Sequence, residues 1–444
     1  MRKARIIFMM TLAAGLFFSC GKENPNFKDF NPAGEGTVFT GVTKTDRTVT
    51  QETRRVFILV SAGYNSLYDY LREDIDDMTK GYLPERTRNS DVVLVISRLT
   101  EKYKDYTTPA SPVLIRLTRE EGEETLMDTV KVWSGDTPVS SASFMREALE
   151  FVRDTYPAAG YGMVFSSHGT GWLPAKYYSN PSNFDPEEGS SIWYAGKRGV
   201  SFGFPEIPEY PAVKSLGQDE GTPYSEIEIQ DLAGAIPMHM DYIILDACLM
   251  GCIEVAYELR NVCDVLGFSQ TEILADGLDY KTLVSRLLEE SVPNVKGVCE
   301  DYFNFYSSRT GSAQSATISL INCKALDNLA SVCATLFAKY QTKLQNMSPD
   351  AVQRYYRAGR HYFYDLKDIL LHCSMTADET AALEEALDAC IVYKAATPRF
   401  INDFDIRVYS GFSMYLPSAC KRADYLNNYY RTSISWNAHT GLVP

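Results

Sequence analysis

The chain has 444 residues, a length that allows one large α/β domain with an addition or two separate domains. Its residues are 45% hydrophobic and 23% charged, a globular composition that excludes a disordered chain, a collagen-like chain and a polytopic membrane protein. The 57 acidic residues outnumber the 43 basic ones and give a net charge of −14, so we expect no nucleic-acid partner.

The N-terminal residues have the pattern of an export signal. Basic residues precede an apolar stretch over 6–18, which is shorter than the roughly 20 residues that a membrane-spanning helix needs. Cys20 follows this stretch after a serine, an arrangement that resembles the lipobox of bacterial lipoproteins, in which the cysteine carries the lipid. We therefore expect a signal peptide over 1–19, lipid attachment at Cys20 and a tether over 20–53. The protein would be secreted across the inner membrane and anchored to the cell envelope or outer membrane; an ordinary membrane anchor is the alternative.

Short apolar runs rich in β-branched residues alternate with helical patterns up to residue 280. The runs that predict buried strands are 55–61, 91–96, 161–166, 242–245 and 262–268. Helical spacing marks 67–78, 140–153 and 225–236. An acidic turn within 112–133 predicts a β-hairpin. The alternation predicts an α/β fold, a mostly parallel sheet flanked by helices, over 54–280.

The pattern changes after residue 280. Long helical periodicity covers 283–288, 298–306, 326–344 and 380–393, and one strand-like run lies late, at 407–415. We therefore expect 262–268 to be the last strand of the core and 281–444 to form a mainly helical C-terminal region. Within the α/β domain, residues 173–224 lack periodicity, and loops of that length are usually functional.

Two of the expected strands end in reactive side chains. His168 and Gly169 follow one strand, and Cys248 follows the next, at what we expect to be the start of a helix that runs on through Glu254. In open α/β sheets such groups gather at the carboxyl ends of strands. A helix N-terminus activates a thiol and an imidazole can protonate a leaving amine, which is what covalent peptide hydrolysis requires. Taken singly, each is more often structural, because buried cysteine packs as a small hydrophobic residue.

Taken together, these residues resemble the clostripain family of cysteine peptidases, relatives of caspases, gingipains and legumain. The matching segments are 156–158, His168-Gly169, 246–251 with Glu254, 269–272 and 410–417, so that roughly 56–417 is covered. The chain departs from the family at Ser166-Ser167, where many members have bulkier or acidic residues, and in the long segment between His168 and Cys248.

The resemblance implies a caspase-like domain with Cys248 as the nucleophile and His168 as its partner. The backbone amides of Gly169 and Cys248 would hold the oxyanion. Family members cut after Arg or Lys, so Asp246 is expected at the base of an acidic substrate pocket, with Asp276 as a second candidate. For Asp246, capping of the following helix is the alternative.

Family members also mature by self-cleavage between the His and the Cys. The long loop carries Lys176, the pair Lys197-Arg198 and Lys214, and Lys197-Arg198 is the favoured site. Some members depend on calcium, but the sequence has no Asp-rich loop of the EF-hand type, and no cysteines and histidines have zinc-ligand spacing. We therefore expect no cofactor.

The sequence thus predicts a secreted cysteine endopeptidase that cleaves proteins or peptides after Arg or Lys through a Cys248–His168 dyad. Its partners would be substrates with basic residues and a membrane reached through the lipid, and we expect a monomer. The contrasting hypothesis is a catalytically inactive, caspase-like surface lipoprotein that acts as a binding module. A third is an active enzyme with a different side-chain preference.

Overall fold

The structure is a computed structural model, and its described residues begin after the expected signal peptide and tether. They are 54–86, 90–99, 110–120, 125–177, 213–214, 219, 225–357, 362–419 and 424–444. The expected lipid site Cys20 and the favoured cleavage pair Lys197-Arg198 lie outside them.

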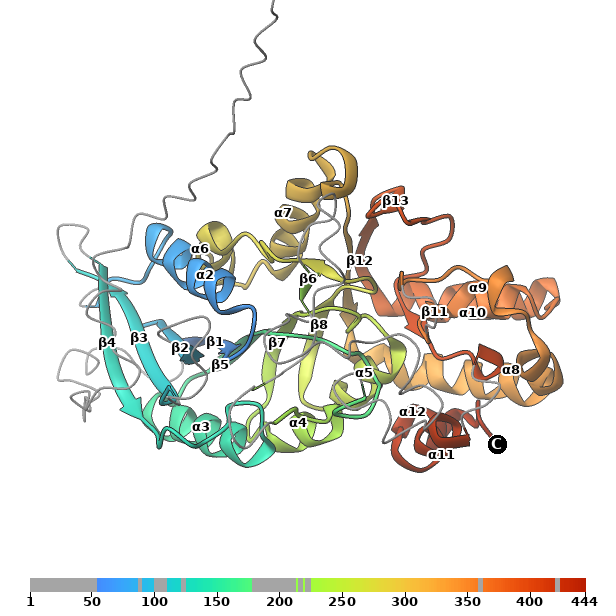
Figure 1. Ribbon diagram of the computed structural model, residues 1–444, viewed down its shortest axis with the longest axis horizontal. Helices are drawn as coiled ribbons and strands as arrows, with labels where there is room; N and C mark the ends of the chain where they lie inside the picture. The colour runs from blue at the N-terminus through green and yellow to red at the C-terminus, as the bar shows by residue number, and fades with distance from the viewer. Residues whose placement is uncertain are drawn as a thin grey trace, which may run out of the picture.

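A nine-stranded sheet forms the centre of the molecule (Figure 1), in the order β12-β10-β8-β7-β5-β1-β2-β3-β4. The strands are β1 Arg55–Gly63, β2 Val92–Leu99, β3 Val113–Arg119, β4 Thr125–Val132, β5 Gly160–Ser166, β7 Met240–Asp246, β8 Cys263–Phe268, β10 Thr317–Asn322 and β12 Ile391–Ala396. The five central strands from β8 to β2 pair in parallel, and the two strands at each edge pair antiparallel. The predicted mostly parallel α/β sheet and the β3–β4 hairpin are thus confirmed.

Helices cover both faces of this sheet (Figure 1). They are α2 Tyr68–Lys80, α3 Ala142–Thr155, α4 Ile229–Ala235, α5 Ile253–Leu259, α6 Tyr280–Leu288, α7 Val295–Ser307, α8 Leu326–Asn346, α9 Leu366–Leu371, α10 Ala377–Cys390, α11 Asp424–Ser433 and α12 Ser435–Thr440. The remaining short elements are β6 Val213–Lys214, β9 Ile273–Leu274, β11 Tyr364–Asp365, β13 Arg399–Phe400, β14 Phe404–Asp405, β15 Ser413–Met414 and the 3-10 turns Gly311–Ala313, Cys323–Ala325, Pro349–Ala351 and Pro417–Ala419.

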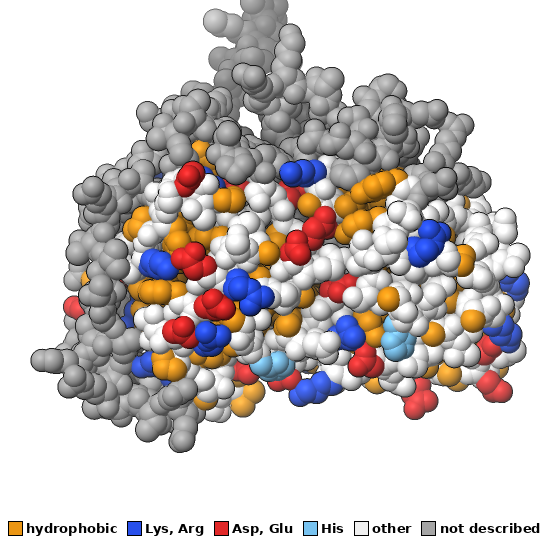
Figure 2. All heavy atoms as spheres, turned by 90° about the horizontal axis from the view of Figure 1, so that it is seen from below, with side chains coloured by type: hydrophobic (Ala, Val, Ile, Leu, Met, Phe, Trp, Pro, Cys, Tyr) orange, Lys and Arg blue, Asp and Glu red, His pale blue; other side chains and the backbone are white. Residues whose placement is uncertain are grey.

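Two hydrophobic clusters lie on the two faces of the sheet because successive strand side chains point in opposite directions. In β1, Ile58 joins the cluster that contains α3, α4 and α5, whereas Leu59 joins the cluster that contains α2, α6 and α7. Burial on both faces explains why the central strands are continuous apolar runs. On the outer face of the α3 side, basic and acidic side chains are interspersed (Figure 2), as in the Arg146–Glu150 pair of α3.

Local signals in the sequence account for several helix boundaries. In α3, the Ser141 side chain accepts a hydrogen bond from the backbone N–H of Phe144 and so caps the helix, as expected from a serine just before an amphipathic run. In α10, Thr376 and Glu379 form a reciprocal capping box. None of the described helices is long and apolar enough to cross a membrane.

The prediction that 262–268 is the last strand of the core was wrong. The region after residue 280 contributes two further strands, β10 and β12, to one edge of the sheet. The expected helix over 380–393 ends at Cys390, and β12 begins at the next residue without an intervening turn signal. Of the expected late strand over 407–415, only Ser413–Met414 pairs, as β15 with β11. Helices still contain more residues of the described C-terminal region than strands do.

Candidate active site

His168 and Cys248 leave adjacent parallel strands at the same level. In the β5–β7 pair Ser166 lies opposite Asp246, so each of the two reactive residues lies two positions past its strand. Both side chains are buried. A Cβ atom on Gly169 would lie 2.2 Å from the carbonyl oxygen of Cys248, so only glycine allows the two loops to approach this closely. The structure therefore brings together the histidine, the glycine and the cysteine that the sequence singled out.

Cys248 lies in a loop, not at the start of a helix. The helix α5 begins only at Ile253, so the expectation that a helix N-terminus contacts the thiol was wrong. Instead, Leu249 adopts a left-handed backbone with φ of 62°. This conformation costs a non-glycine residue about 1 kcal/mol or more. The backbone N–H of Leu249 donates to the carbonyl of Thr271 at 2.9 Å, which holds this strained turn in place.

The thiol of Cys248 contacts the short strand β9. The backbone N–H of Ile273 donates to its Sγ at 3.2 Å. Strand β9 also pairs antiparallel with β6, where Val213 lies opposite Leu274 and Lys214 opposite Ile273. A segment of the loop between His168 and Cys248 therefore runs along the strand that touches the sulfur.

The imidazole of His168 meets a residue that the sequence did not single out. Ser66, in the turn after β1, has its Oγ 3.1 Å from His168 Nε2. β1 pairs in parallel with β5, so its end lies at the same edge of the sheet as the other two loops. The end of a third central strand was the signal that could have pointed to this serine.

Asp246 is fully buried beneath the two loops. Its Oδ2 accepts hydrogen bonds from Ser166 Oγ at 2.8 Å and from Tyr280 OH at 2.7 Å. It does not cap α5, whose N-cap residue is Cys252. The alternative that Asp246 caps the following helix was therefore wrong, and Tyr280 is a partner that sequence reasoning missed.

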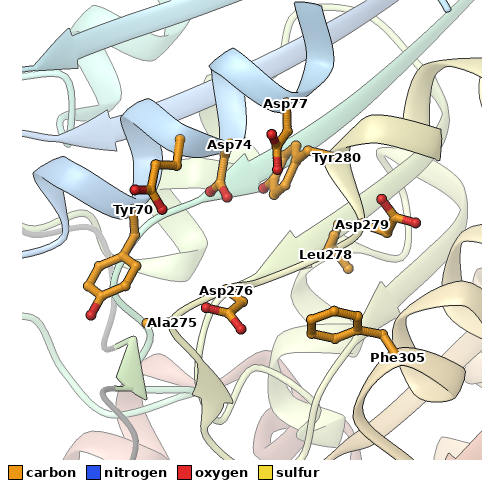
Figure 3. A pocket seen from close by; sticks show the side chains of 10 residues that line it. Tyr70, Asp74, Asp77, Ala275, Asp276, Leu278, Asp279, Tyr280 and Phe305 are labelled. Carbon is orange, nitrogen blue, oxygen red and sulfur yellow. The ribbon is translucent and has the colours of Figure 1, made fainter. Parts of the chain in front are cut away.

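Asp276, three residues beyond Ile273, lines a cavity of about 270 Å³ (Figure 3). Its other carboxylates come from α2 and from the start of α6: Glu73, Asp74, Asp77 and Asp279. Tyr280, which holds Asp246, also lines it, and the lining residues within the described part of the chain include neither Lys nor Arg. Burial, and then the charges of Asp77, Asp69 and Asp276, raise the pKa of Glu73.

The α2 carboxylates of this cavity were missed by sequence reasoning. The segment 67–78 was identified only as an amphipathic helix, although acidic residues crowd its polar face. Such a concentration on one face could have been noticed, but its juxtaposition with Asp276 depends on the packing of α2 against α6.

The C-terminal region packs against the residues around both loops. Glu254 is fully buried and accepts hydrogen bonds from the backbone N–H of Tyr415 at 2.8 Å and from Tyr430 OH at 2.7 Å, and its burial raises the pKa to about 7. Trp172, in the histidine loop, packs against the same two tyrosine rings at centroid distances of 4.7 and 5.1 Å. Glu254 therefore links α5 to the C-terminal region.

A second buried carboxylate lies directly before β9. Glu272 accepts a hydrogen bond at 3.0 Å from the guanidinium of Arg357, and both side chains are buried. Burial raises the pKa of Glu272 to about 7, although the charge of Arg357 acts in the opposite direction. The pair fixes the C-terminal region to the strand that touches Cys248.

Of the basic residues in the long loop, Lys176 and Lys214 are described. Lys176 is exposed, has a left-handed backbone with φ of 68°, and its backbone N–H donates to the carboxylate of Glu226. The preceding N–H, of Ala175, donates to Glu228 at 2.9 Å, so Lys176 lies in an anchored turn rather than in an extended segment.

Comparison with known proteins shows the family of this chain. The sequence model described as the clostripain family matches residues 59–192 and 206–440. The chain belongs to the clostripain family. It is therefore a cysteine endopeptidase, and the resemblance, the fold class and the enzyme class predicted from the sequence are confirmed. No curated protein matches the chain.

Solved structures of clostripain-family (C11) proteases share the fold. An inactive zymogen of a C11 protease from Parabacteroides distasonis is 25% identical, with a TM-score of 0.68, and the match covers 88% of this chain and 99% of that one. A secreted C11 cysteine protease from Bacteroides thetaiotaomicron, solved with an irreversible peptide inhibitor, is 22% identical, with a TM-score of 0.66 and coverage of 87% and 99%. The same organism's iotapain is 21% identical, with a TM-score of 0.65 and coverage of 88% and 100%.

Proposed function

We propose that this clostripain-family peptidase is a secreted enzyme that cleaves proteins or peptides after Arg or Lys, with Cys248 as the nucleophile and His168 as its acid–base partner. The observation that carries the proposal is the β5–β7 register, which places both residues at neighbouring strand ends. β9 then leads from the thiol to a cavity lined by carboxylates.

The chemistry follows from these two side chains. The Cys248 thiol gives its proton to His168, the sulfur attacks the scissile carbonyl carbon, and the C–N bond breaks as His168 passes that proton to the leaving amine. Water then attacks the thioester and gives a proton to the imidazole. The C–S bond breaks, the acid is released, and the imidazole returns the proton to the sulfur. The amides of Gly169 and Cys248, whose backbones lie against each other, are suited to hold the oxyanion.

The acidic cavity supports the preference for basic residues. A guanidinium or ammonium group before the scissile bond would meet Asp276 and the carboxylates of α2, while Asp246 lies below, behind Tyr280. A hydrogen bond to a charged group contributes about 1.5–3 kcal/mol, enough to select Arg and Lys over neutral side chains.

The β6–β9 pair supports an extended substrate and self-processing of the loop. An antiparallel segment along β9 is the arrangement that a bound peptide would adopt, through main-chain hydrogen bonds. Among the candidates this favours Lys214, whose backbone lies opposite Ile273, over Lys176 in its left-handed turn. Lys197-Arg198 remains a candidate.

Because a similar chain is an inactive zymogen, we propose that the uncut chain is also a zymogen. N-terminal sequencing of the mature protein would identify the cut. A single chain that is active without being cut would reject self-processing and the zymogen proposal.

Export, lipid attachment and cofactor independence complete the proposal. Cys20 would carry the lipid, and the folded monomer would remain at the membrane through its tether. Incorporation of labelled fatty acid that persists in Cys20→Ser would reject the lipid site. The reaction needs only the thiol and the imidazole, so a chelator is expected to leave the activity of the mature enzyme unchanged, and a loss restored by calcium would indicate a metal requirement.

Hydrolysis of short fluorogenic peptides ending in Arg or Lys tests the central proposal. We expect Cys248→Ala and His168→Ala to lose activity by at least about 10³-fold, because each removes a participant in bond cleavage. As a matched control, Cys373→Ala removes another buried thiol, remote in sequence from both loops, and should keep the activity of the parent. Equal hydrolysis by the parent and Cys248→Ala would reject the dyad. A correctly processed but inactive parent would favour the binding-module hypothesis.

A further inference from the structure

Ser66 makes a contact with the imidazole that the proposed dyad does not use. Its Oγ lies 3.1 Å from His168 Nε2, and its side chain is half-buried in the turn between β1 and α2. A hydroxyl group has one donor and two acceptor sites, so it can bond to this nitrogen whether or not the nitrogen carries a proton.

The turn that carries Ser66 is fixed by a buried neighbour. Asn65 is fully buried, its side-chain amide donates to the carbonyl of Ala62 at 2.9 Å, and its Oδ1 accepts from the backbone N–H of Leu67 at 2.9 Å. These bonds bracket Ser66 on both sides and leave its backbone little freedom. Its hydroxyl therefore has a defined position.

The same turn is tied to the histidine loop from the other side. Ser167, directly before His168, donates from its Oγ to the carbonyl of Ala62 at 2.9 Å. The imidazole and the serine that contacts it are thus held in one hydrogen-bonded frame at the ends of β5 and β1. A hydrogen bond that is fixed in this way holds the orientation of an imidazole.

We propose that Ser66 is a positioning residue for His168, which accepts a hydrogen bond from Nε2–H and so leaves Nδ1 as the nitrogen that exchanges protons with the reactants. The inference rests on the proposed Cys248–His168 dyad. In acylation, Nδ1–H passes its proton to the leaving amine while Nε2–H stays bonded to Ser66. In deacylation, Nδ1 takes a proton from the attacking water, so Ser66 keeps its bond in both half-reactions.

Kinetics of Ser66 variants test this role on the same Arg and Lys peptides. We expect Ser66→Ala to lower kcat by about 3- to 10-fold with KM changed by less than about 2-fold, the effect of one lost hydrogen bond. Loss of the acceptor destabilises the imidazolium, so the alkaline limb of the kcat profile should move to lower pH by about 0.5 to 1 unit. Ser66→Thr, which keeps the hydroxyl, should restore both.

Ser167→Ala provides a matched structural control. It removes a serine hydroxyl bonded to the same turn without contact to the imidazole ring, so it should lower the melting temperature and leave the alkaline limb in place. The proposal would be overturned if Ser66→Ala kept the kcat and the alkaline limb of the parent, or if Ser167→Ala shifted the alkaline limb by the same amount.

A spectroscopic readout separates this inference from the proposed function. In protein labelled with ¹⁵N-histidine, with His168 assigned through His168→Ala, the parent should show Nε2 protonated in the neutral imidazole, and Ser66→Ala should show a mixture of tautomers. This measurement needs no substrate. An unchanged tautomer in Ser66→Ala would overturn the role of Ser66, whereas a missing hydrolytic activity would count only against the proposed function.

Discussion

Two concave regions of this peptidase are rich in aspartate, yet they differ in whether basic side chains balance the negative charge. The cavity beyond β9 gathers carboxylates from α2 and the 275–279 loop, and Lys80 contacts Asp77 only from outside its lining. A groove of about 540 Å³ in the C-terminal region has four aspartates among its lining residues but also three arginines. There Arg354 pairs with Asp403 at 3.1 Å and Arg399 with Asp405 at 3.1 Å.

The difference shows that the content of acidic residues does not define a site. In the groove the chain supplies its own cations, so little negative potential is left for a ligand. In the cavity the carboxylates face one another, and burial together with the resulting repulsion raises the pKa of Glu73. A cation brought by a substrate would relieve the repulsion.

Between the two regions, the largest change in activity is expected when a negative charge of the cavity is removed. Asp276→Asn should lower kcat/KM for Arg and Lys peptides by about 10-fold, because an exposed carboxylate that bonds a cation contributes at the lower end of charged hydrogen bonds. Asp403→Asn is the matched control from the groove and should leave kcat/KM within about 2-fold. Equal losses in the two variants would mean that the comparison does not describe specificity.

A second effect concerns a buried carboxyl that lies in neither region. Glu254 has its pKa raised to about 7, so the folded state favours the neutral form while the unfolded state ionises near pH 4.5. Its contribution to stability is therefore lost as the pH rises from about 4.5 to 7. Glu254→Gln should stabilise the protein at pH 8 by up to about 3 kcal/mol, measured by urea unfolding, with little change at pH 4.

The side chain of Glu254 makes glutamine a suitable replacement. Tyr415 N–H and Tyr430 OH both donate to Oε1, an acceptor that glutamine keeps. Glu258→Gln on the same helix, where the carboxylate is only partly buried against Ser435, is the control and should not flatten the pH dependence. If the stability of the parent does not fall between pH 5 and pH 8, the raised pKa of Glu254 is contradicted.

The smallest effect is expected in the groove itself. Asp405→Asn weakens contacts with Arg399 and Arg407, whose side chains are 57% and 81% exposed. Exposed ion pairs contribute about 0–1 kcal/mol, so the free energy of unfolding should fall by no more than that and activity should stay at the parent value. A loss of activity in Asp405→Asn would show that the groove affects the reaction and would contradict this comparison.

The sequence predicted the central strands and the two reactive loops because these features are local. An apolar run followed by His168 or by Cys248 carries its own signal, and parallel pairing brings the two ends together without further information. The edge strand β12 was missed because it follows α10 directly and its side chains are only partly buried. The strand Thr317–Asn322 was missed because the surrounding helical periodicity concealed it.

The site residues that the sequence did not identify depend on tertiary packing. Nothing in the sequence distinguishes Ser66 from other serines, and only the pairing of β1 with β5 brings it to His168. Tyr280 begins a helix more than thirty residues after Asp246, and only the fold brings its hydroxyl to that carboxylate. The carboxylates of α2 face Asp276 because α2 packs against α6.

The strand order has a consequence for a processed molecule. Every strand of the central sheet that precedes the loop between His168 and Cys248 lies on one side of the β5–β7 boundary, and every strand that follows the loop lies on the other. A cut in this loop would yield two polypeptides that meet along this boundary, each with its own contiguous half of the sheet and one member of the proposed dyad. The active site would then form at the interface between two chains, and neither fragment alone would be active.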